Sequence, residues 1–431
     1  MIIKKREFPE YKSYSMELAG RTLTLETGKL AELANAAVMV KYGETSVLVA
    51  VTASSRPRDG IDYFPLSVDF EEKLYAVGKI PGGFLRREAR PPEQAVLAGR
   101  AIDRPMRPLF PADLRNDVVI TCTIMSVDHD CEPEVAGAIG AAVAVCISDV
   151  PFNGPIATVT LGYIDGEYLI NPTSAQRAES EMHCTIAGTR DKIVMIEAEA
   201  NEVPEDVMMN GIIAAHGEIK RIIELIDQMV AEIGKPKFEY AQASFNNELF
   251  DKIVDKYLED VKYCMDTDDK NVREERYNAV VEKMFAEFSE EYPEITAQLE
   301  EITYRIQKMV VKAWLLEGKR VDGRTSNEIR ALSAEVGVLP RVHGSGLFTR
   351  GQTQVLSVAT LDTIAAMQKL DTIHEETNKR YMHHYNFPSF SVGEARGSRS
   401  TSRREYGHGA LAEKALLPVL PTLEEFPYAI R

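Results

Sequence analysis

The sequence predicts an α+β fold in which two related repeats are joined by an all-helical segment. Tyr42–Val51 and Arg350–Ala359 are similar: each has a glycine, a threonine two residues later, and then a Val-Leu pair. An Arg-Arg-Glu triplet follows each stretch, at 86–88 and at 403–405. The stretch 235–317, by contrast, has no glycine, although glycine is frequent on both sides. We therefore expect two strand-containing repeats with a helical segment between them.

Domain boundaries follow from these features. We place the first repeat at residues 1–234, the helical segment at 235–317 and the second repeat at 318–431. The first repeat continues far beyond its Arg-Arg-Glu triplet, whereas the sequence ends at Arg431 shortly after the second triplet. We expect only the N-terminal part of the second repeat in this chain.

Strands are predicted where β-branched residues alternate or cluster. Val38–Tyr42 and Ser46–Thr52 form a predicted hairpin that turns at Gly43. Asp117–Met125 and Ile156–Tyr163 are further strands. An Asp-Gly turn follows the last of these and leads into a short return strand.

Two apolar stretches of the first repeat predict helices. Pro133–Ser148 is rich in small apolar residues, which indicates a tightly packed helix, and Ile212–Ile233 has the length and composition of another. Strands mixed with packed helices at this density indicate an α+β unit.

Three runs of apolar residues at helical spacing occur in the segment 235–317, at 249–261, 277–288 and 295–310. Pro293 separates the last two runs. Acidic residues outnumber basic ones in this segment, so we expect a spacer or packing domain and a poor RNA-binding surface.

Composition excludes several classes of protein. The 431 residues carry a formal net charge of −16, which argues against indiscriminate binding of polyanions. No apolar run approaches the length of a membrane span, and the N-terminus lacks the apolar core of a signal peptide, so we expect a cytoplasmic protein without membrane contact. The 5 scattered cysteines include no Cys-x-x-Cys pair and are expected to be reduced structural thiols.

Cations are concentrated in two places. The first is the stretch that follows Pro81, where a glycine-flexed loop presents an aromatic ring and two arginines, and a predicted helix adds three more at spacings of four and three. These candidate RNA-binding residues are Phe84, Arg86, Arg87, Arg100, Arg104 and Arg107. A ring that stacks on a base beside guanidinium groups that bind phosphates suits single-stranded nucleic acid. A solvated, salt-bridged surface is the alternative, and Pro105 weakens the argument that the three helical arginines share a face.

The second cationic stretch is Gly393–His408, where arginines lie amid glycine and serine. Its basic residues are Arg396, Arg399, Arg403, Arg404 and His408. Such a loop favours an anion site, in which His408 donates to a phosphate oxygen or has a purely structural role.

These features together resemble bacterial polynucleotide phosphorylases. The resemblance extends over the whole chain and rests on the paired repeats, the helical segment and four motifs in order. The motifs are Phe84–Glu88, Ala101–Pro111, Gly318–Arg324 and Arg403–Gly409. It implies two RNase PH-like cores joined by an all-α domain and assembled as a homotrimer around a central pore. The implied reaction is processive 3′-to-5′ phosphorolysis of single-stranded RNA, in which inorganic phosphate releases nucleoside diphosphates with the help of Mg²⁺.

The resemblance also assigns residues. Phe84, Arg86 and Arg87 match the loop that narrows the pore and holds RNA, although Leu85 stands where the family usually has a second phenylalanine. Arg403, Arg404 and His408 match residues that line the active site of the second core. The family's phosphate-binding serines and acidic metal site lie beyond Arg431, so no metal ligand is expected in this chain and the isolated chain is expected to be inactive.

The first core is expected to be catalytically inactive. Where the family's catalytic core has its serine run, this chain has the acidic stretch Asp128–Glu134, which would repel phosphate, and only Glu181 retains an acid in the region equivalent to the metal site. The alternate acids of that stretch could instead form a calcium loop, but it lacks the glycine and the distal glutamate of such loops. A non-catalytic RNA-binding or assembly protein is the alternative to the enzyme.

Overall fold

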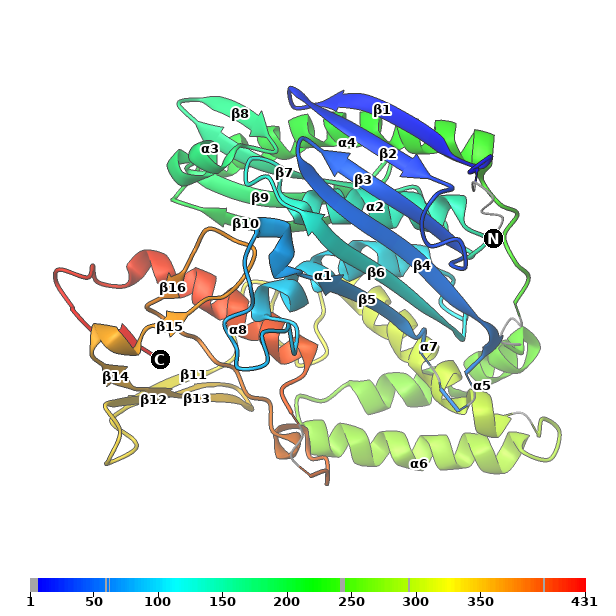
Figure 1. The fold of residues 1–431 in the computed structure, drawn as a ribbon. Helices are drawn as coiled ribbons and strands as arrows, with labels where there is room; N and C mark the ends of the chain where they lie inside the picture. The colour runs from blue at the N-terminus through cyan, green and yellow to red at the C-terminus, as the bar shows by residue number, and fades with distance from the viewer. Residues whose placement is uncertain (1–6, 59, 62, 241–244, 294, 398–399) are drawn as a thin grey trace. The chain divides into compact units, whose positions relative to one another are not determined.

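The computed structural model describes residues 7–58, 60–61, 63–240, 245–293, 295–397 and 400–431. The chain forms two compact units (Figure 1). One contains Met1–Gln242 together with Thr360–Arg431, and the other contains Ala243–Ala359. The second repeat is thus divided between the two units at residue 360.

The first compact unit is built on a sheet of 6 strands in the order β1-β2-β3-β4-β6-β5. Only β5 and β6 pair in parallel. The strands are β1 (Lys12–Leu18), β2 (Arg21–Thr27), β3 (Ala36–Tyr42), β4 (Thr45–Pro57), β5 (Leu66–Glu71) and β6 (Asn116–Ser126). The predicted hairpin is confirmed, because β3 and β4 pair antiparallel and Gly43 has a φ of 55°, which suits glycine at the turn.

A second sheet of 4 strands has the order β10-β9-β7-β8. Its strands are β7 (Ala157–Ile164), β8 (Glu167–Ile170), β9 (Met182–Gly188) and β10 (Ile193–Ala200). The Asp165-Gly166 turn joins β7 to β8 as predicted, with positive φ at both residues.

The helices of the first repeat are α1 (Glu93–Met106), α2 (Pro133–Ile147), α3 (Ser174–Glu179) and α4 (Glu205–Ile233). α2 contacts β3 and β4 of one sheet and β7 of the other, and every residue of α2 except Glu134 is buried. A β-carbon on Gly140 would lie 2.6 Å from methyl groups of Val40 and Val49, so only a small residue lets the helix approach the sheet this closely. The small-residue stretch is therefore the tightly packed helix that was predicted, and it lies in the core between the two sheets.

The segment Thr360–Arg431 adds short elements to the same unit. They are β14 (Leu361–Asp362), β15 (Gln368–Lys369), β16 (Asn378–Lys379), α8 (Arg403–Leu416) and β17 (Ala429–Ile430). This segment also has three 3-10 helices: η3 (Ile364–Ala366) follows β14, and η4 (Ser389–Val392) and η5 (Leu417–Val419) flank α8. In the first repeat, η1 (Leu74–Val77) and η2 (Arg107–Leu109) flank α1 in the same way. α8 packs against α1, which attaches this segment to the first repeat.

The second compact unit contains the three predicted helices, α5 (Asn247–Met265), α6 (Lys270–Phe288) and α7 (Ile295–Leu316), around an apolar core of their own. It also contains the antiparallel strands β11 (Leu332–Val336), β12 (Gly344–Arg350) and β13 (Thr353–Ala359). None of the helices in the described residues has the length and apolar character needed to cross a membrane.

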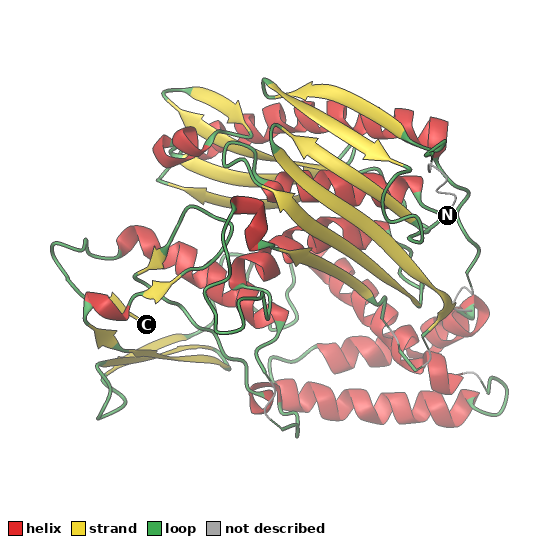
Figure 2. Cartoon of the chain, viewed as in Figure 1, coloured by secondary structure: helices red, strands yellow, loops and turns green. Residues whose placement is uncertain are grey.

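The α+β class is confirmed (Figure 2). The start of α4 and the start of the helical segment differ from the prediction. α4 begins at Glu205 rather than Ile212, because acidic residues in its first turn extend it beyond the apolar run. Lys235–Tyr240, at the start of the glycine-free segment, is not helical: the backbone N–H of Lys235 donates to Ile147 and that of Phe238 to Asp149. Absence of glycine therefore marks the start of the helices less well than apolar periodicity does.

Candidate nucleic-acid interface

The loop Pro81–Arg87 carries the most exposed aromatic ring of the first cationic stretch. It lies between η1, which ends at Gly78 in the left-handed conformation, and α1. Phe84 is 98% exposed and Leu85 is 81% exposed. Arg86 has a φ of 51°, and its guanidinium donates to the carbonyl oxygens of Pro81 and Gly82 at 3.4 and 3.3 Å. The loop therefore closes on itself and directs its apolar tip into solvent.

Two carboxylates hold the base of this loop. Glu88 accepts the backbone N–H of Leu74 at 3.0 Å, and backbone amides hold the pKa of Glu88 below its usual range. Asp371, from the second repeat, accepts the backbone N–H of Gly82 at 2.6 Å. The stem is thus fixed while Phe84 and Arg87 remain exposed. Such a fixed stem with an exposed ring suits base stacking.

The three arginines predicted on one helix face have other partners. Arg107 lies beyond α1, in η2, and it donates to Asp103 at 2.6 Å and to backbone carbonyls of Phe64 and Leu66 at 3.1 Å. Arg104 pairs with Glu197 at 3.0 Å.

Arg100 is half-buried beside α8: a β-carbon on Gly407 would lie 2.6 Å from its Nε. Burial, followed by the charge of Arg104, lowers the pKa of Arg100. These contacts are intramolecular, so the helical arginines chiefly join elements of the protein, and the loop offers the more accessible cations.

The second cationic stretch is organised by α8. Ser402 caps the helix in a capping box with Glu405, which also accepts the N–H of Phe387 at 2.9 Å. Backbone N–H groups of Ser402 and Phe387 lower the pKa of Glu405. Arg399 lies outside the described residues.

The three candidate active-site residues of α8 differ in their surroundings. Arg403 donates to the carbonyl oxygen of Val68 at 2.8 Å and pairs with Asp69, at the end of the helix nearest β5. Arg404 is exposed, and His408 lies one turn further along the same face, with its ring edge-on to Tyr385 at 5.0 Å. Arg404 and His408 could therefore contact one anion together, whereas Arg403 has protein partners.

The two Arg-Arg-Glu triplets do not occupy equivalent positions. Residues 86–88 lie in the loop before α1, whereas residues 403–405 form the first turn of α8. α1 and α8 themselves correspond, since each has 14 residues and continues directly into a 3-10 helix of 3 residues. The prediction that one triplet recurs as the other is therefore wrong in structural terms, although the two glutamates act alike: each accepts a backbone N–H near the preceding 3-10 helix.

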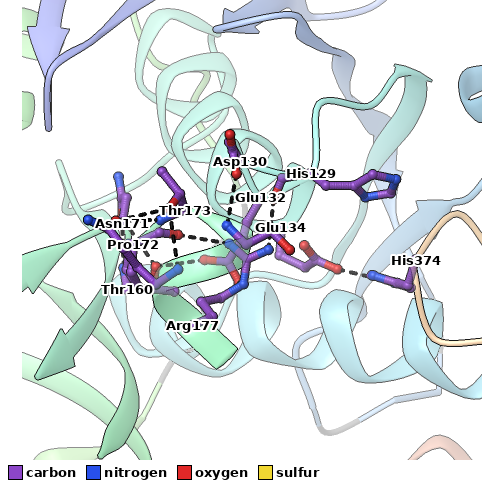
Figure 3. A network of polar contacts seen from close by, with 12 residues as sticks. His129, Asp130, Glu132, Glu134, Thr160, Asn171, Pro172, Thr173, Arg177 and His374 are labelled. Atoms are coloured by element: carbon purple, nitrogen blue, oxygen red, sulfur yellow. Dashed lines mark hydrogen bonds and ion pairs between the residues drawn. The ribbon is translucent and has the colours of Figure 1, made fainter. Parts of the chain in front are cut away.

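The acidic stretch Asp128–Glu134 does not converge on one point (Figure 3). Asp128 accepts the N–H of Asp130, and Asp130 accepts the N–H of Ser174. Glu132 accepts the hydroxyl of Thr160 at 2.7 Å and lies 3.8 Å from Arg177, while Glu134 faces His374 at 3.5 Å. No group of three or more His, Cys, Asp or Glu among the described residues is arranged to hold a metal ion. The carboxylates of this stretch serve as structural acceptors, which argues against a calcium loop.

Sequence reasoning missed Asp371 and His374. Neither belongs to a motif, and each acts on a residue about 240 to 300 positions earlier in the chain. The 5 cysteines are free and buried, as expected for structural thiols.

Comparisons with known proteins agree with this architecture. The model of the 3′ exoribonuclease family, domain 1, matches residues 19–151 and 328–431, and that of domain 2 matches residues 154–218. The model of the polyribonucleotide nucleotidyltransferase RNA binding domain matches residues 248–325.

Three relatives are each named polyribonucleotide nucleotidyltransferase. The protein of Ruminiclostridium cellulolyticum is 55% identical over 98% of this chain and 60% of its own length. That of Lachnoclostridium phytofermentans is 54% identical over 98% of this chain and 61% of its own length, and that of Clostridioides difficile is 50% identical over the same two shares. The chain thus spans about 60% of the length of these relatives.

Among solved structures, the crystal structure of rice (Oryza sativa) Rrp46 aligns with a TM-score of 0.40 and 12% identity, over 48% of this chain and 94% of that one. That likeness adds nothing to the assignment, which rests on the family models and the relatives. By the match of domain 1 to both repeats, the chain belongs to the 3′ exoribonuclease family, with the domain order of polyribonucleotide nucleotidyltransferases.

Proposed function

We propose that this protein takes part in processive 3′-to-5′ phosphorolysis of single-stranded RNA, releasing nucleoside diphosphates. The observation that carries the proposal is the loop Pro81–Arg87, whose fixed stem presents an exposed phenylalanine beside an exposed arginine. Stacking of a base on a ring does not depend on base identity, and a neighbouring cation holds the backbone phosphate. A processive exonuclease needs to bind RNA in this way, without dependence on its sequence.

The proposal assigns the chemistry to the second repeat. Arg404 and His408 share a helix face on which positive charge and a hydrogen-bond donor could hold a phosphate group, and Arg403 would join them on release from Asp69. Phosphorolysis needs such charge because both the attacking phosphate and the scissile phosphodiester are anionic. Family membership favours this enzymatic role over a non-catalytic assembly protein.

Mg²⁺, a homotrimeric ring and a cytoplasmic location belong to the proposal by resemblance alone. The described residues offer no cluster of ligands for Mg²⁺, so no step of the reaction is assigned to it through this chain. When bound, a divalent ion would offset the charge that develops during in-line displacement at phosphorus.

The first test is the affinity for a short single-stranded RNA at several salt concentrations. Phe84→Ala should weaken binding about tenfold through lost stacking, without changing the salt slope. Arg87→Ala should weaken binding and also reduce the magnitude of the slope of log affinity against log salt by about 0.7. Arg190→Ala is the control, because that arginine pairs with Asp227 away from the loop.

The second test is the release of nucleoside diphosphates from the same RNA when phosphate and Mg²⁺ are supplied. Phosphate-dependent release would support the proposal, and release of monophosphates without phosphate would contradict it. The same assay is run on a version extended to the length of the relatives, because the resemblance places the phosphate-binding serines and the metal site beyond Arg431. RNA binding with no release of either product by both versions would favour the non-catalytic alternative. Equal RNA affinity of the wild type and both loop variants would remove the loop from the interface.

A further inference from the structure

A short segment of the second repeat is anchored against the first repeat beside the RNA loop. This segment, Asp371–Glu375, is here called the strap. Ile373 at its centre is fully buried in the core of the first compact unit. The strap is therefore attached to the core and reaches the loop from a fixed base.

Both ends of the strap contact the first repeat. Asp371 accepts the backbone N–H of Gly82 at 2.6 Å, and Lys79 donates to the carbonyl oxygen of Thr372 at 3.4 Å. At the other end, the hydroxyl of Ser174 donates to Glu375. Gly82 lies two residues before Phe84, so the position of the strap determines the position of the loop's stem.

His374 lies between two carboxylates. Its Nε2 is 3.5 Å from Oε1 of Glu72 and 3.5 Å from Oε1 of Glu134, and Figure 3 shows the ring directed toward the acidic residues at the start of α2. The side chain of Glu72 is only 3% exposed, and neither of its oxygens has a hydrogen-bond partner among the described residues. A buried carboxylate without a cation is costly, so the proton on His374 is the natural counter-charge.

We propose that the strap positions the RNA-binding loop, and that protonated His374 holds the strap in place by bridging Glu72 and Glu134. This inference rests on the proposed function, because it assigns the loop its role in binding RNA. His374 and Asp371 act as positioning residues: Asp371 fixes the stem of the loop through Gly82, and His374 fixes Asp371. RNA affinity thereby becomes sensitive to pH.

The direction of the pH effect follows from the groups around the imidazole. Glu72 faces it from just beyond β5, Glu134 from the first turn of α2 and Glu132 from the N-cap of that helix. Lys79 lies against the strap, which itself carries Asp371 and Glu375. Burial by itself would lower the pKa of His374, but the close contact with Glu72 and the charge of Glu134 outweigh burial and raise it.

A raised pKa in the folded state means that the bridge contributes fully below the ordinary histidine pKa of about 6.5 and is lost as pH rises through the folded value. Partial burial also raises the pKa of Glu134, so protonation of that carboxyl weakens the bridge at the acidic end. The strap should therefore hold the loop most firmly in a mildly acidic to neutral window.

Amide hydrogen exchange of the peptide that contains Gly82 and Gly83 reports the strap without using RNA. At pH 6, His374→Gln should speed exchange there about tenfold relative to the wild type, and the difference should shrink as the pH is raised toward 8.5. Asp371→Asn should speed exchange at both pH values, since it removes the charged acceptor. Glu376→Gln is the matched control, because Glu376 is exposed just beyond the strap.

A double variant distinguishes loss of the bridge from a general folding defect. Glu72→Gln combined with His374→Gln replaces the charged pair with two neutral amides, so the strap should hold again and the pH dependence should disappear. Recovery of protection at both pH values would support the bridge. If His374→Gln leaves exchange at pH 6 unchanged, the strap does not depend on His374 and the inference is overturned.

RNA affinity measured on the same variants separates the two proposals. If His374→Gln shows faster exchange and about threefold weaker RNA binding, both the RNA role of the loop and its positioning by the strap are supported. Faster exchange with unchanged RNA affinity overturns the inference when Phe84→Ala still weakens binding. When Phe84→Ala is also without effect, the RNA role of the loop is wrong, while the mechanical coupling of strap to loop stands.

Discussion

A β-carbon on Gly99 of α1 would lie 2.9 Å from the carbonyl oxygen of Val68 in β5. α1 therefore crosses β5 at a distance that only glycine allows. The same contact recurs in the second repeat, where a β-carbon on Gly409 would lie 3.0 Å from the carbonyl oxygen of His383. Each glycine is the seventh residue of a 14-residue helix. The two repeats are thus related by this helix crossing more clearly than by their Arg-Arg-Glu triplets.

The crossing predicts a stability effect. Gly99→Ala should lower the free energy of unfolding by about 1–3 kcal/mol, because the carbonyl oxygen belongs to the backbone of β5 and cannot move aside cheaply. Chemical denaturation followed by circular dichroism measures this loss. Gly409→Ala should act in the same direction.

Gly217→Ala provides the matched control for that prediction. Gly217 lies within α4, is exposed, and has nothing within 4 Å of its β-carbon position. Alanine there should raise the free energy of unfolding by about 0.5–1 kcal/mol through helix propensity. If Gly99→Ala and Gly217→Ala have the same effect, the close approach of α1 to β5 is not under steric constraint.

The C-terminus of α2 predicts a second effect on stability. Nζ of Lys237 donates to the carbonyl oxygens of Val145, Cys146 and Ser148 at 3.1, 2.9 and 2.6 Å. A cation at this end of a helix satisfies carbonyls that have no partner in the helix and interacts favourably with the helix dipole.

Lys237→Met keeps the aliphatic part of the side chain but removes its three donors. We expect the free energy of unfolding to fall by about 2–3 kcal/mol, since several partly buried carbonyls lose a charged donor. Lys220→Met, at an exposed position of α4, should change it by less than about 0.5 kcal/mol. Similar losses in the two variants would show that Lys237 acts through general surface charge.

The buried thiols give a prediction about reactivity. Burial raises the pKa of Cys122 and of Cys146 to about 12 and that of Cys131 to about 11. At pH 8 these thiols are therefore protonated as well as shielded. A thiol-specific chromogenic disulfide reagent should detect none of the 5 cysteines in the folded protein and all of them after unfolding. Rapid reaction of one thiol in the folded state would contradict the burial of that residue.

Apolar patterns predicted the fold because the buried residues are local in sequence. The hairpin of β3 and β4 has a turn glycine between two runs of β-branched residues, and α2 is recognisable from its small apolar residues alone. The three helices α5–α7 likewise follow from the spacing of their own core residues. In each case the signal lies within about 20 residues.

The candidate site was predicted only in part, since its geometry depends on distant contacts. Phe84 is exposed, as expected for a residue in a glycine-rich loop. Nothing near Phe84 in sequence, however, indicates that Asp371 accepts the N–H of Gly82. Arg107 pairs with Asp103 four residues earlier, in line with the salt-bridged alternative, whereas the partner of Arg104 is the distant Glu197. Charged residues have many suitable partners, so a list of cations cannot tell which ones remain available for RNA.

The pair formed by Arg403 and Asp69 yields the final prediction. Arg403 also donates to the carbonyl oxygen of Val68, and the side chains of the pair are 51% and 39% exposed. At that exposure the ion pair should contribute no more than about 1 kcal/mol to folding.

If Arg403 binds phosphate during the reaction, Asp69 competes with that phosphate for the guanidinium. Asp69→Asn should therefore strengthen binding of inorganic phosphate or RNA about two- to threefold, with little loss of stability. Arg403→Ala should weaken binding, and adding Asp69→Asn to Arg403→Ala should cause no further change in affinity.

Asp117→Asn is the matched control, because Asp117 pairs with Arg58 at similar exposure on another part of the surface. Equal affinities for Asp69→Asn and Asp117→Asn, measured by titration calorimetry, would mean that Arg403 only joins α8 to β5 and does not take part in the anion site.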